Sequence, residues 1–448
     1  MEDKIIQGNP TKSFFIEMIT RDISIKDAIL DLLDNSIDGA NNINPGDFNN
    51  LYIDITVNKD CFIIKDNCGG FTLETAQKYA FRFGRPDEAP KTGGSIGRFG
   101  VGMKRALFKI GQNFEVESKN GYDHFQVNVN VNEWKYKKKE IRDFENNLIE
   151  VDDWSFQYSL ITDETSDLVE NGTFIKVLNL NQEVYNIFAI ESFLIELEDD
   201  IERLLNFSIE KGLKIILNGK VLQKKGVTLF SDNSKPYFHE FIDNGIKIRV
   251  VAGLSFVGDP HTSGWYIYCN DRLVLEADKT DITGWGTSGI PQWHVDYVMF
   301  KGLVFMDSEE TINLPLTTTK KGIDATSIVY KKAFFFMREA MVSVLGFLKD
   351  VRKLGDEAND YRKLLGEQET KISVQELKVN SFESKRTFVS PVLDYEKISI
   401  RNNSVRISFN ADKNLAEMGK LHSGSKSFKE FGEYIFNYYL KMEELRDE

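Results

Sequence analysis

The sequence predicts an α+β protein of more than one domain, and three observations support this fold class. The chain has 448 residues, whereas a single domain usually has about 100–200. Residues 24–40 repeat apolar side chains at helical spacing, and Ser24 is placed to cap that helix. Residues 114–180 contain stretches that alternate apolar and polar side chains, as antiparallel strands do. The first part of the chain is therefore expected to combine helices with antiparallel strands.

Between these segments the sequence predicts a hairpin and a loop. Residues 51–57 and 61–66 are short strand candidates joined by a hairpin-like turn. Residues 82–102 contain too many glycines for the interior of a helix or strand, and they lead into a helix, MKRALFKI, that Gly111 closes. We therefore expect a lid, centred on residues 82–96, in front of a helix N-terminus.

The rest of the chain is expected to form a second strand-rich region and a helical tail. A helix over 185–211 ends the first region. The best strands of the second region are LKIILNG, IKIRVVAGL and GWYIYCNDRLVLE. Residues 325–365 indicate one long helix or two in series, and Ser427 with Glu430 forms a capping box for a last helix. The predicted domains are residues 1–211, 212–345 and 346–448.

Composition excludes several classes of protein. Hydrophobic residues make up 41% and charged residues 28%, which is typical of a folded globular chain. With 56 Lys+Arg against 69 Asp+Glu the net charge is −13, which argues against a surface that coats nucleic acid. Three cysteines are too few for a disulfide scaffold and lack zinc-site spacing. The most apolar run is interrupted by Arg338 and Glu339, so we expect a cytoplasmic protein without a membrane span.

The predicted helix at 24–40 carries a polar stripe opposite its apolar face. Asp31, Asn35 and Asp38 stand at i, i+4 and i+7 and therefore project from one side. The amide oxygen of Asn35 can bind a hard cation such as Mg²⁺, with a carboxylate one turn away on either side. Such a stripe is more often a solvated face, so it does not indicate a metal site by itself.

A second feature is the segment DNCGGF at residues 66–71. Asp66 ends a predicted strand, and the glycines that follow allow a planar ring to approach the backbone. A carboxylate in this position can accept a hydrogen bond from the exocyclic amine of adenine. Taken alone, the segment is more often an ordinary hairpin loop.

The third feature is GRFGVG at residues 97–102, which opens the helix that ends before Gly111. Its backbone N–H groups and the helix dipole provide a site for phosphate, and Lys104 and Arg105 add positive charge. A single glycine pattern of this kind is usually a turn. The three features occur in order, and this order favours a nucleotide-binding site.

On these segments the sequence resembles the GHKL superfamily of ATPases, which includes DNA gyrase, heat-shock chaperones, histidine kinases, MutL and the MORC proteins. DLLDNSIDGA resembles its N-box, DNCGGF and GRFGVGMKRA its two glycine boxes, and NGTFIKV the strand whose threonine, here Thr173, reaches the adenine. The resemblance covers residues 24–180. It implies the Bergerat fold, an α/β sandwich with a mixed, largely antiparallel sheet, and it implies ATP and Mg²⁺ as ligands.

The resemblance also implies roles for individual residues. Asp31 is the water-activating acid and Asn35 the Mg²⁺ ligand. The nucleotide contacts are Asn35, Asp38, Asp66, Gly70, Gly97, Phe99, Gly100, Val101, Gly102, Lys104 and Thr173. The family usually has Glu where this chain has Asp31, and the shorter side chain predicts slow hydrolysis. Cys68 stands where a glycine is usual.

The second region resembles the transducer domain of MutL-like and MORC-like members, with GWYIYCNDRLVLE similar to its central strands. LPLTTTKKGID resembles the loop whose lysine contacts the γ-phosphate; Lys320 is the first choice for that lysine and Lys321 the second. The alternative is a solvated lysine pair. The resemblance implies an ATP-gated homodimeric clamp that takes part in a DNA transaction or in bacterial genome defence.

Two other functions are known for chains with such a nucleotide-binding pattern, and the sequence bears on both. A histidine kinase would need an acceptor helix before the ATP domain, and no histidine precedes residue 124. A nucleotide-sensing interaction protein with little hydrolysis is the alternative that the short acid Asp31 favours. Expected partners are a second copy and either DNA or an effector protein. A basic cluster beside Trp134 and Tyr136 is the candidate DNA contact: Lys135, Lys137, Lys138, Lys139 and Arg142.

Overall fold

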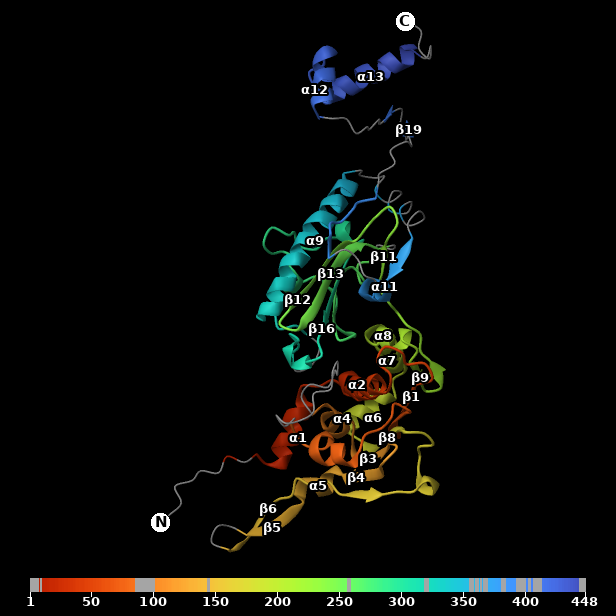
Figure 1. The fold of residues 1–448 in the computed structure, drawn as a ribbon, viewed down its shortest axis with the longest axis vertical. Helices are drawn as coiled ribbons and strands as arrows, with labels where there is room; N and C mark the ends of the chain where they lie inside the picture. The colour runs from red at the N-terminus through yellow and green to blue at the C-terminus, as the bar shows by residue number, and fades with distance from the viewer. Residues whose placement is uncertain are drawn as a thin grey trace, which may run out of the picture. The chain divides into compact units, whose positions relative to one another are not determined.

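The computed structural model describes residues 8, 10–84, 101–142, 146–255, 259–317, 322–353, 358, 362, 365, 370–379, 384–391, 400–401, 404–405 and 413–442. The chain divides into two compact units, Met1–Ser390 and Pro391–Glu448. The first unit contains two large sheets with their helices (Figure 1). The predicted lid, residues 82–96, lies outside the described residues from residue 85 onward.

The first sheet has eight strands in the order β10-β9-β1-β2-β8-β3-β4-β7. Only the pairing of β1 with β9 is parallel among the pairings within this sheet. The mixed, largely antiparallel sheet is therefore confirmed. Its strands are β1 (Tyr52–Val57), β2 (Cys61–Asp66), β3 (Gly111–Lys119), β4 (His124–Asn130), β7 (Tyr158–Leu160), β8 (Gly172–Leu180), β9 (Lys214–Leu217) and β10 (Lys220–Val221).

The predicted place of LKIILNG was wrong. The segment was assigned to the second region, but it forms β9, which lies beside β1 in the first sheet. The alternation of side chains identifies a strand without naming its neighbour, which depends on contacts distant in sequence. The first sheet therefore continues past residue 211 to Val221.

Helices pack on the first sheet because both elements have one apolar side. In β1 and β2 every second residue is buried, and these side chains share a core with the apolar stripe of α2. The helices of this part are α1 (Lys12–Arg21), α2 (Ile25–Ile43), α3 (Leu73–Thr75), a π-helical turn η1 (Ala76–Ala80), α4 (Gly102–Ile110), α5 (Val131–Tyr136), α6 (Gln182–Phe188), α7 (Glu191–Leu204) and α8 (Asn206–Glu210). A short 3₁₀ turn, η2, covers Asp163–Thr165.

The helix predicted over 185–211 is three shorter helices. Ile190 has extended backbone angles and separates α6 from α7, and Leu205 leaves the helical region between α7 and α8. The apolar spacing across the three helices resembles that of one helix because α6 and α7 each turn an apolar face to the same core.

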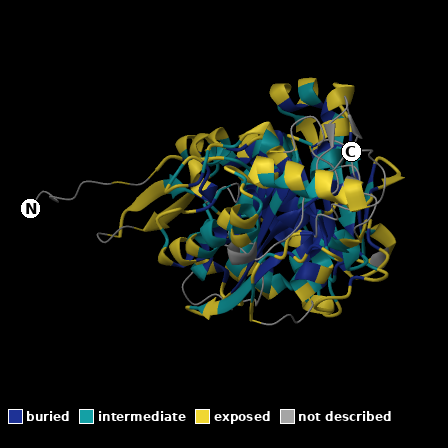
Figure 2. Ribbon diagram, turned by 90° about the horizontal axis from the view of Figure 1, so that it is seen from above, coloured by how far each residue is buried: buried dark blue, intermediate teal, exposed yellow. Residues whose placement is uncertain are grey.

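The second sheet has six strands in the order β15-β14-β16-β13-β12-β18. The strands are β12 (Tyr237–Asp243), β13 (Ile246–Leu254), β14 (Gly264–Cys269), β15 (Arg272–Asp278), β16 (Phe300–Asp307) and β18 (Lys385–Arg386). The long helix α9 (Ile328–Arg352) packs on this sheet. The 3₁₀ turns are η3 (Asp281–Thr283), η4 (Val295–Tyr297) and η5 (Thr311–Asn313). Buried residues concentrate on the strands, as Figure 2 shows.

The chain returns to the second region after α9. Strand β17 (Lys371–Ser373) pairs with β11 (Thr228–Phe230), and β18 pairs with β12. The helix α11 (Val374–Val379) contributes Val374 and Leu377 to a core shared with β13, β14 and β16. Part of the segment that was expected to form a separate tail therefore packs with the second sheet.

Two strand pairs and two helices complete the fold. A hairpin, β5 (Lys138–Arg142) with β6 (Leu148–Asp152), is largely exposed. The second unit contains a short pair, β19 (Ile400–Arg401) with β20 (Ser404–Val405), and two helices, α12 (Lys413–His422) and α13 (Phe428–Met442). Ser427 accepts the N–H of Glu430 at 3.2 Å, which confirms the predicted helix start. Among the described residues, no helix has the length and apolarity that a membrane crossing requires.

Candidate functional site

The helix α2 carries the predicted polar stripe, and its residues differ in burial. Ser24 caps the helix by accepting the N–H of Asp27 at 3.1 Å. On the polar side Asp31 is buried, Asn35 is exposed and Asp38 is half-buried. The stripe therefore runs from a carboxylate inside the protein to an amide that solvent or a ligand can reach.

Asp31 lies against the first turn of α4. Its Oδ2 accepts a hydrogen bond from Nη2 of Arg105 at 2.5 Å, and only 7% of the Asp31 side chain is exposed. A Cβ added to Gly102, the first residue of α4, would lie 3.5 Å from the same oxygen. The structure thus brings the predicted acid next to the predicted phosphate-binding helix. The sequence pattern indicates Arg105 only as positive charge beside the glycine segment.

Asp66 ends β2 and is almost completely buried. Its carboxylate accepts hydrogen bonds from Oγ of Ser36 at 2.7 Å, from the N–H of Cys68 at 2.9 Å and from the N–H of Thr173 at 3.1 Å. Burial raises the pKa of this carboxyl, although the three donors oppose the shift. A carboxylate has about four acceptor positions, so one further donor can be accommodated.

The turn after Asp66 depends on two glycines. Gly70 has a φ of +60°, and a Cβ there would lie 2.3 Å from the carbonyl oxygen of Lys119. Gly39, on α2, faces the same turn, and its Cβ would lie 2.5 Å from the carbonyl oxygen of Cys68. Gly39 allows α2 and the turn to approach closely enough for Ser36 to reach Asp66, whereas Gly70 lets the turn pack on the backbone of β3 and β8. Sequence reasoning missed Ser36 and Gly39, although both lie inside the quoted N-box.

The helix α4 begins at Gly102, after Val101, which supplies no side-chain cap. The first N–H groups of the helix, together with its dipole, are suited to an anion. Gly97, Phe99 and Gly100 lie outside the described residues, so their predicted phosphate contacts stay predictions. Figure 1 shows α2 and α4 side by side over the first sheet.

Lys104 does not extend into solvent. Its Nζ donates to the carbonyl oxygens of Ala80 and Arg82, at 2.7 Å each, and 1% of the residue is exposed. Burial lowers the pKa of Lys104 to about 7. In this structure the residue ties α4 to the chain at the start of the predicted lid, and its phosphate contact stays a prediction.

The second sheet also contacts the N-box helix. Nη1 of Arg272, the first residue of β15, donates to Oδ1 of Asp34 on α2 at 3.0 Å. Sequence reasoning did not single out either residue, because no local pattern relates two positions so distant in sequence. Lys320 and Lys321, the predicted γ-phosphate contacts, lie outside the described residues.

The basic cluster near residue 135 differs from its expected form. Trp134 is buried and stacks on Phe156 with ring centroids 5.1 Å apart, so it presents no face to a nucleic acid base. Lys137 pairs with Asp153 at 3.0 Å and Lys138 with Asp152 at 2.8 Å. Of the remaining members, Lys135 on α5 is half-buried, and Lys139 and Arg142 on the β5–β6 hairpin are exposed. A DNA contact there stays a prediction.

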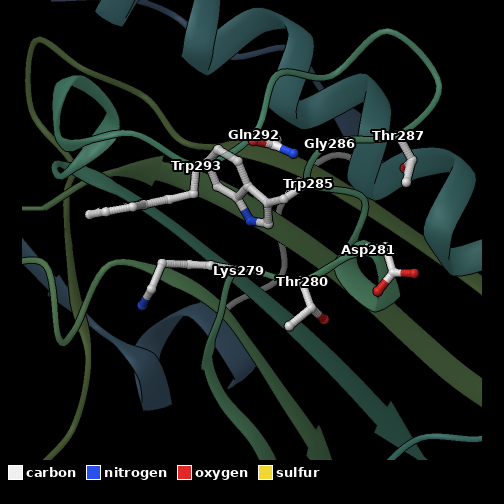
Figure 3. Close-up of a pocket in the computed structure, with 8 residues that line it drawn as sticks. All are labelled: Lys279, Thr280, Asp281, Trp285, Gly286, Thr287, Gln292 and Trp293. Atoms are coloured by element: carbon white, nitrogen blue, oxygen red, sulfur yellow. The ribbon is translucent and has the colours of Figure 1, made fainter.

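A separate cavity of about 570 Å³ lies beyond the end of β15 (Figure 3). Trp285, Trp293 and Lys279 line it with five other residues, Thr280, Asp281, Gly286, Thr287 and Gln292. Nζ of Lys279 donates to the carbonyl oxygens of Ser263 and Ala277 at 2.8 Å each, so its charge is already stabilised by the backbone. Sequence reasoning did not predict this cavity.

Comparison with known families agrees with the geometry. Residues 23–166 match a family model described as histidine kinase-, DNA gyrase B- and HSP90-like ATPase. The matched segment includes α2, the turn after Asp66 and α4, and it ends before β8. No curated protein matches the chain.

Proposed function

Because residues 23–166 match the histidine kinase-, DNA gyrase B- and HSP90-like ATPase model, we propose that the protein is a GHKL-type ATPase that binds ATP with Mg²⁺ and hydrolyses it to ADP and phosphate. The nucleotide would lie between α2, the turn after β2 and the first turn of α4. The observation that carries the proposal is Asp66, a buried carboxylate held by Ser36, Cys68 and Thr173 with acceptor capacity remaining.

At the adenine end, Asp66 would accept a hydrogen bond from the exocyclic amine. Because three donors from three different elements already orient the carboxylate, little rearrangement is needed for recognition. Gly70 adopts a conformation that side chains disfavour, and its lack of a side chain lets the turn that holds Asp66 pack against the carbonyl oxygens of Lys119 and Gly172.

At the phosphate end, the residues present fit a Mg²⁺ ion. Asn35 offers an exposed amide oxygen, and Asp38, one turn further along α2, is half-buried. When bound, Mg²⁺ neutralises charge on the phosphate oxygens. The N–H groups at the start of α4 would hold the phosphates, and Lys320 from the second region would contact the γ-phosphate.

Asp31 is the proposed general base for the attacking water. Its carboxylate lies at the first turn of α4, where the γ-phosphate would lie, and Arg105 holds it in place. A base in this position takes a proton from water as the water attacks the γ-phosphorus, while the bond from that phosphorus to the β–γ bridging oxygen breaks and ADP leaves with the electron pair. Asp31 is one methylene shorter than the family's usual Glu and is engaged by Arg105, so we expect slow turnover.

The test separates binding from chemistry. ATP hydrolysis and binding of a non-hydrolysable ATP analogue would be measured for wild type, Asn35→Ala and Asp31→Ala. We expect Asn35→Ala to lose Mg²⁺-dependent binding and Asp31→Ala to bind normally but lose turnover. Equal turnover of Asp31→Ala and wild type would remove Asp31 from the chemistry, and absence of saturable binding by wild type would overturn the proposal.

A second candidate is a nucleotide-sensing protein with little hydrolysis. The salt bridge between Asp31 and Arg105 favours this candidate, because a carboxylate paired with an arginine is poorly placed to accept a proton from water. Tight ATP binding by wild type with no measurable phosphate release would support it over the ATPase.

The cellular role proposed is an ATP-gated homodimeric clamp that acts in a DNA transaction or in genome defence, with DNA or an effector protein as partner. The resemblance to MutL-like and MORC-like proteins supports this role. Gel filtration with and without a non-hydrolysable ATP analogue tests the clamp: a dimer that requires nucleotide supports it, and an unchanged mass contradicts it.

A further inference from the structure

The turn between β14 and β15 contacts the nucleotide-binding part of the chain. Cys269 pairs with Arg272, so the loop consists of Asn270 and Asp271, whose φ angles of 46° and 67° define a tight turn. Such a turn has few alternative conformations, so the charged residues at its tip are held in fixed positions.

Arg272 enters a buried ion pair with α2. Its Nη1 lies 3.0 Å from Oδ1 of Asp34, and the exposed fractions of the two side chains are 7% and 0%. Asp34 directly precedes Asn35, the proposed Mg²⁺ ligand. Removing either partner would leave an uncompensated charge inside the protein, so the second sheet and α2 are held together at this point.

The same turn makes a second charged contact with the nucleotide-binding part. Asp271 pairs with Lys211, between α8 and β9, at 2.7 Å, and it also pairs with Lys378 of α11. Lys378 pairs in addition with Asp307 at the end of β16, at 2.7 Å. Lys211 therefore fixes the turn to the nucleotide-binding part of the chain, and Lys378 fixes it to the second region.

The helix α2 is held by two arginines from different elements. Arg105 of α4 pairs with Asp31, and Arg272 of β15 pairs with Asp34, one turn along the same helix. A shift of α4 on binding phosphate would move α2 through Asp31. It would then either break the pair of Asp34 with Arg272 or displace the β14–β15 turn.

The present contacts of Arg272 leave one donor unsatisfied. Its Nε is buried and has no hydrogen-bond partner among the described residues. Buried donors are normally paired, so the arrangement seen does not fully satisfy the guanidinium. The guanidinium of Arg272 therefore keeps donor capacity that its pair with Asp34 does not use.

We propose that Arg272 is a positioning residue that couples the nucleotide site to the second sheet through Asp34. The pair sets the position of α2, and with it Asn35 and Asp31, and it transmits nucleotide binding to the β14–β15 turn. Because coupling between two sites is reciprocal, the second sheet also influences the nucleotide site. This inference rests on the proposed ATP function.

The experiment uses the full chain with Mg²⁺ and a non-hydrolysable ATP analogue. Backbone hydrogen exchange of residues 264–278 would be compared with and without analogue, alongside analogue affinity, kcat and KM for ATP. The variants are Arg272→Met, Arg272→Lys and the double variant Asp34→Asn/Arg272→Gln, which leaves no lone buried charge. Arg249→Met is the matched control, because Arg249 is equally buried but pairs with Glu240 inside the second sheet.

In wild type and in Arg249→Met, we expect the analogue to slow exchange in residues 264–278. Arg272→Met and the double variant should bind the analogue but lose this slowing, with kcat about tenfold lower and KM little changed. Arg272→Lys should restore part of the analogue-dependent slowing and part of kcat, because lysine keeps the positive charge but lacks the planar guanidinium group.

Two results would overturn the inference. If Arg272→Met and the double variant keep the analogue-dependent slowing and the wild-type kcat, the pair does not couple the two parts. If wild type binds no analogue at all, the proposed ATP function itself fails, and the coupling fails with it. The two failures are distinguished by analogue binding to wild type.

Discussion

The two ends of the candidate site hold their carboxylates in different ways. Asp66, at the proposed adenine end, accepts hydrogen bonds from three neutral donors that come from α2, the glycine turn and β8. Asp31, at the proposed phosphate end, is paired with the charged Arg105. The adenine end is thus preformed. At the phosphate end, a bound triphosphate would compete with Asp31 for the positive charge of Arg105. Recognition and chemistry are expected to respond to substitution differently.

The largest expected effect is on turnover at the phosphate end. Asp31→Asn keeps the shape of the side chain but cannot accept a proton from water, so kcat should fall by about 10²–10⁴-fold with ATP affinity changed only a few-fold. Steady-state phosphate release measures kcat, and Asp27→Asn, on the same helix, is the control. If Asp31→Asn turns over ATP at the wild-type rate, Asp31 is not the group that accepts the proton, and the proposed chemistry at the phosphate end is wrong.

A smaller effect is expected on affinity at the adenine end. Asp66→Asn places amide hydrogens where Ser36, Cys68 and Thr173 already donate, and it repels the adenine amine. The affinity for ATP should fall by about 10–100-fold. Calorimetric titration measures it, with inosine triphosphate, which lacks the exocyclic amine, as a matched ligand. Wild type should prefer ATP and the variant should not; a preserved preference would assign adenine recognition to another residue.

The close approach of α2 to the glycine turn can be broken without removing a charge. In Gly39→Ala the new Cβ would lie 2.5 Å from the carbonyl oxygen of Cys68, so α2 must move away from the turn. The free energy of unfolding should fall by about 1–3 kcal/mol, as measured by urea denaturation. Gly346→Ala, in α9, has no atom within 4 Å of its new Cβ and should be neutral or stabilising. Equal stability of the two variants would mean that α2 has room to move.

The pH dependence of stability is expected to differ in sign at the two ends. Burial lowers the pKa of Lys104 from 10.5 to about 7, so above pH 7 the unfolded chain binds more protons than the folded one. The free energy of unfolding should therefore rise between about pH 7 and 10, and Lys104→Met should flatten this rise.

Burial raises the pKa of Asp66, so the folded chain keeps this proton longer than the unfolded chain does. The contribution of Asp66 to stability is present below its unfolded pKa and is lost as pH rises through its folded pKa. Asp66→Asn should remove this acid-side decline. Urea denaturation at several pH values checks both variants, and the same pH dependence in wild type and Lys104→Met would contradict the account of Lys104.

Local features of the site could be predicted from sequence, and distant pairings could not. Ser24, the apolar face of α2 and the placement of Asp66 at a strand end follow from patterns within a few residues. The bond of Ser36 to Asp66 spans 30 positions and the pair of Asp34 with Arg272 spans 238. No periodicity relates such positions, because their contact depends on how complete elements pack.

Two errors illustrate the same limit. The alternation in LKIILNG predicts a strand correctly. Its parallel pairing with β1, however, joins segments that are far apart in the sequence, and no local pattern shows it. Trp134 was grouped with the basic residues around it, yet its ring fills a core against Phe156. The residue types that neighbour a side chain in the sequence do not determine whether that side chain is buried or exposed.

The most direct test is a crystal structure of the full chain with Mg²⁺ and a non-hydrolysable ATP analogue. The account predicts the adenine amine at Asp66, the triphosphate at the first turn of α4 and the metal ion on the amide oxygen of Asn35. A nucleotide bound elsewhere, for example in the cavity beside Trp285, with α2 and α4 unoccupied, would contradict it.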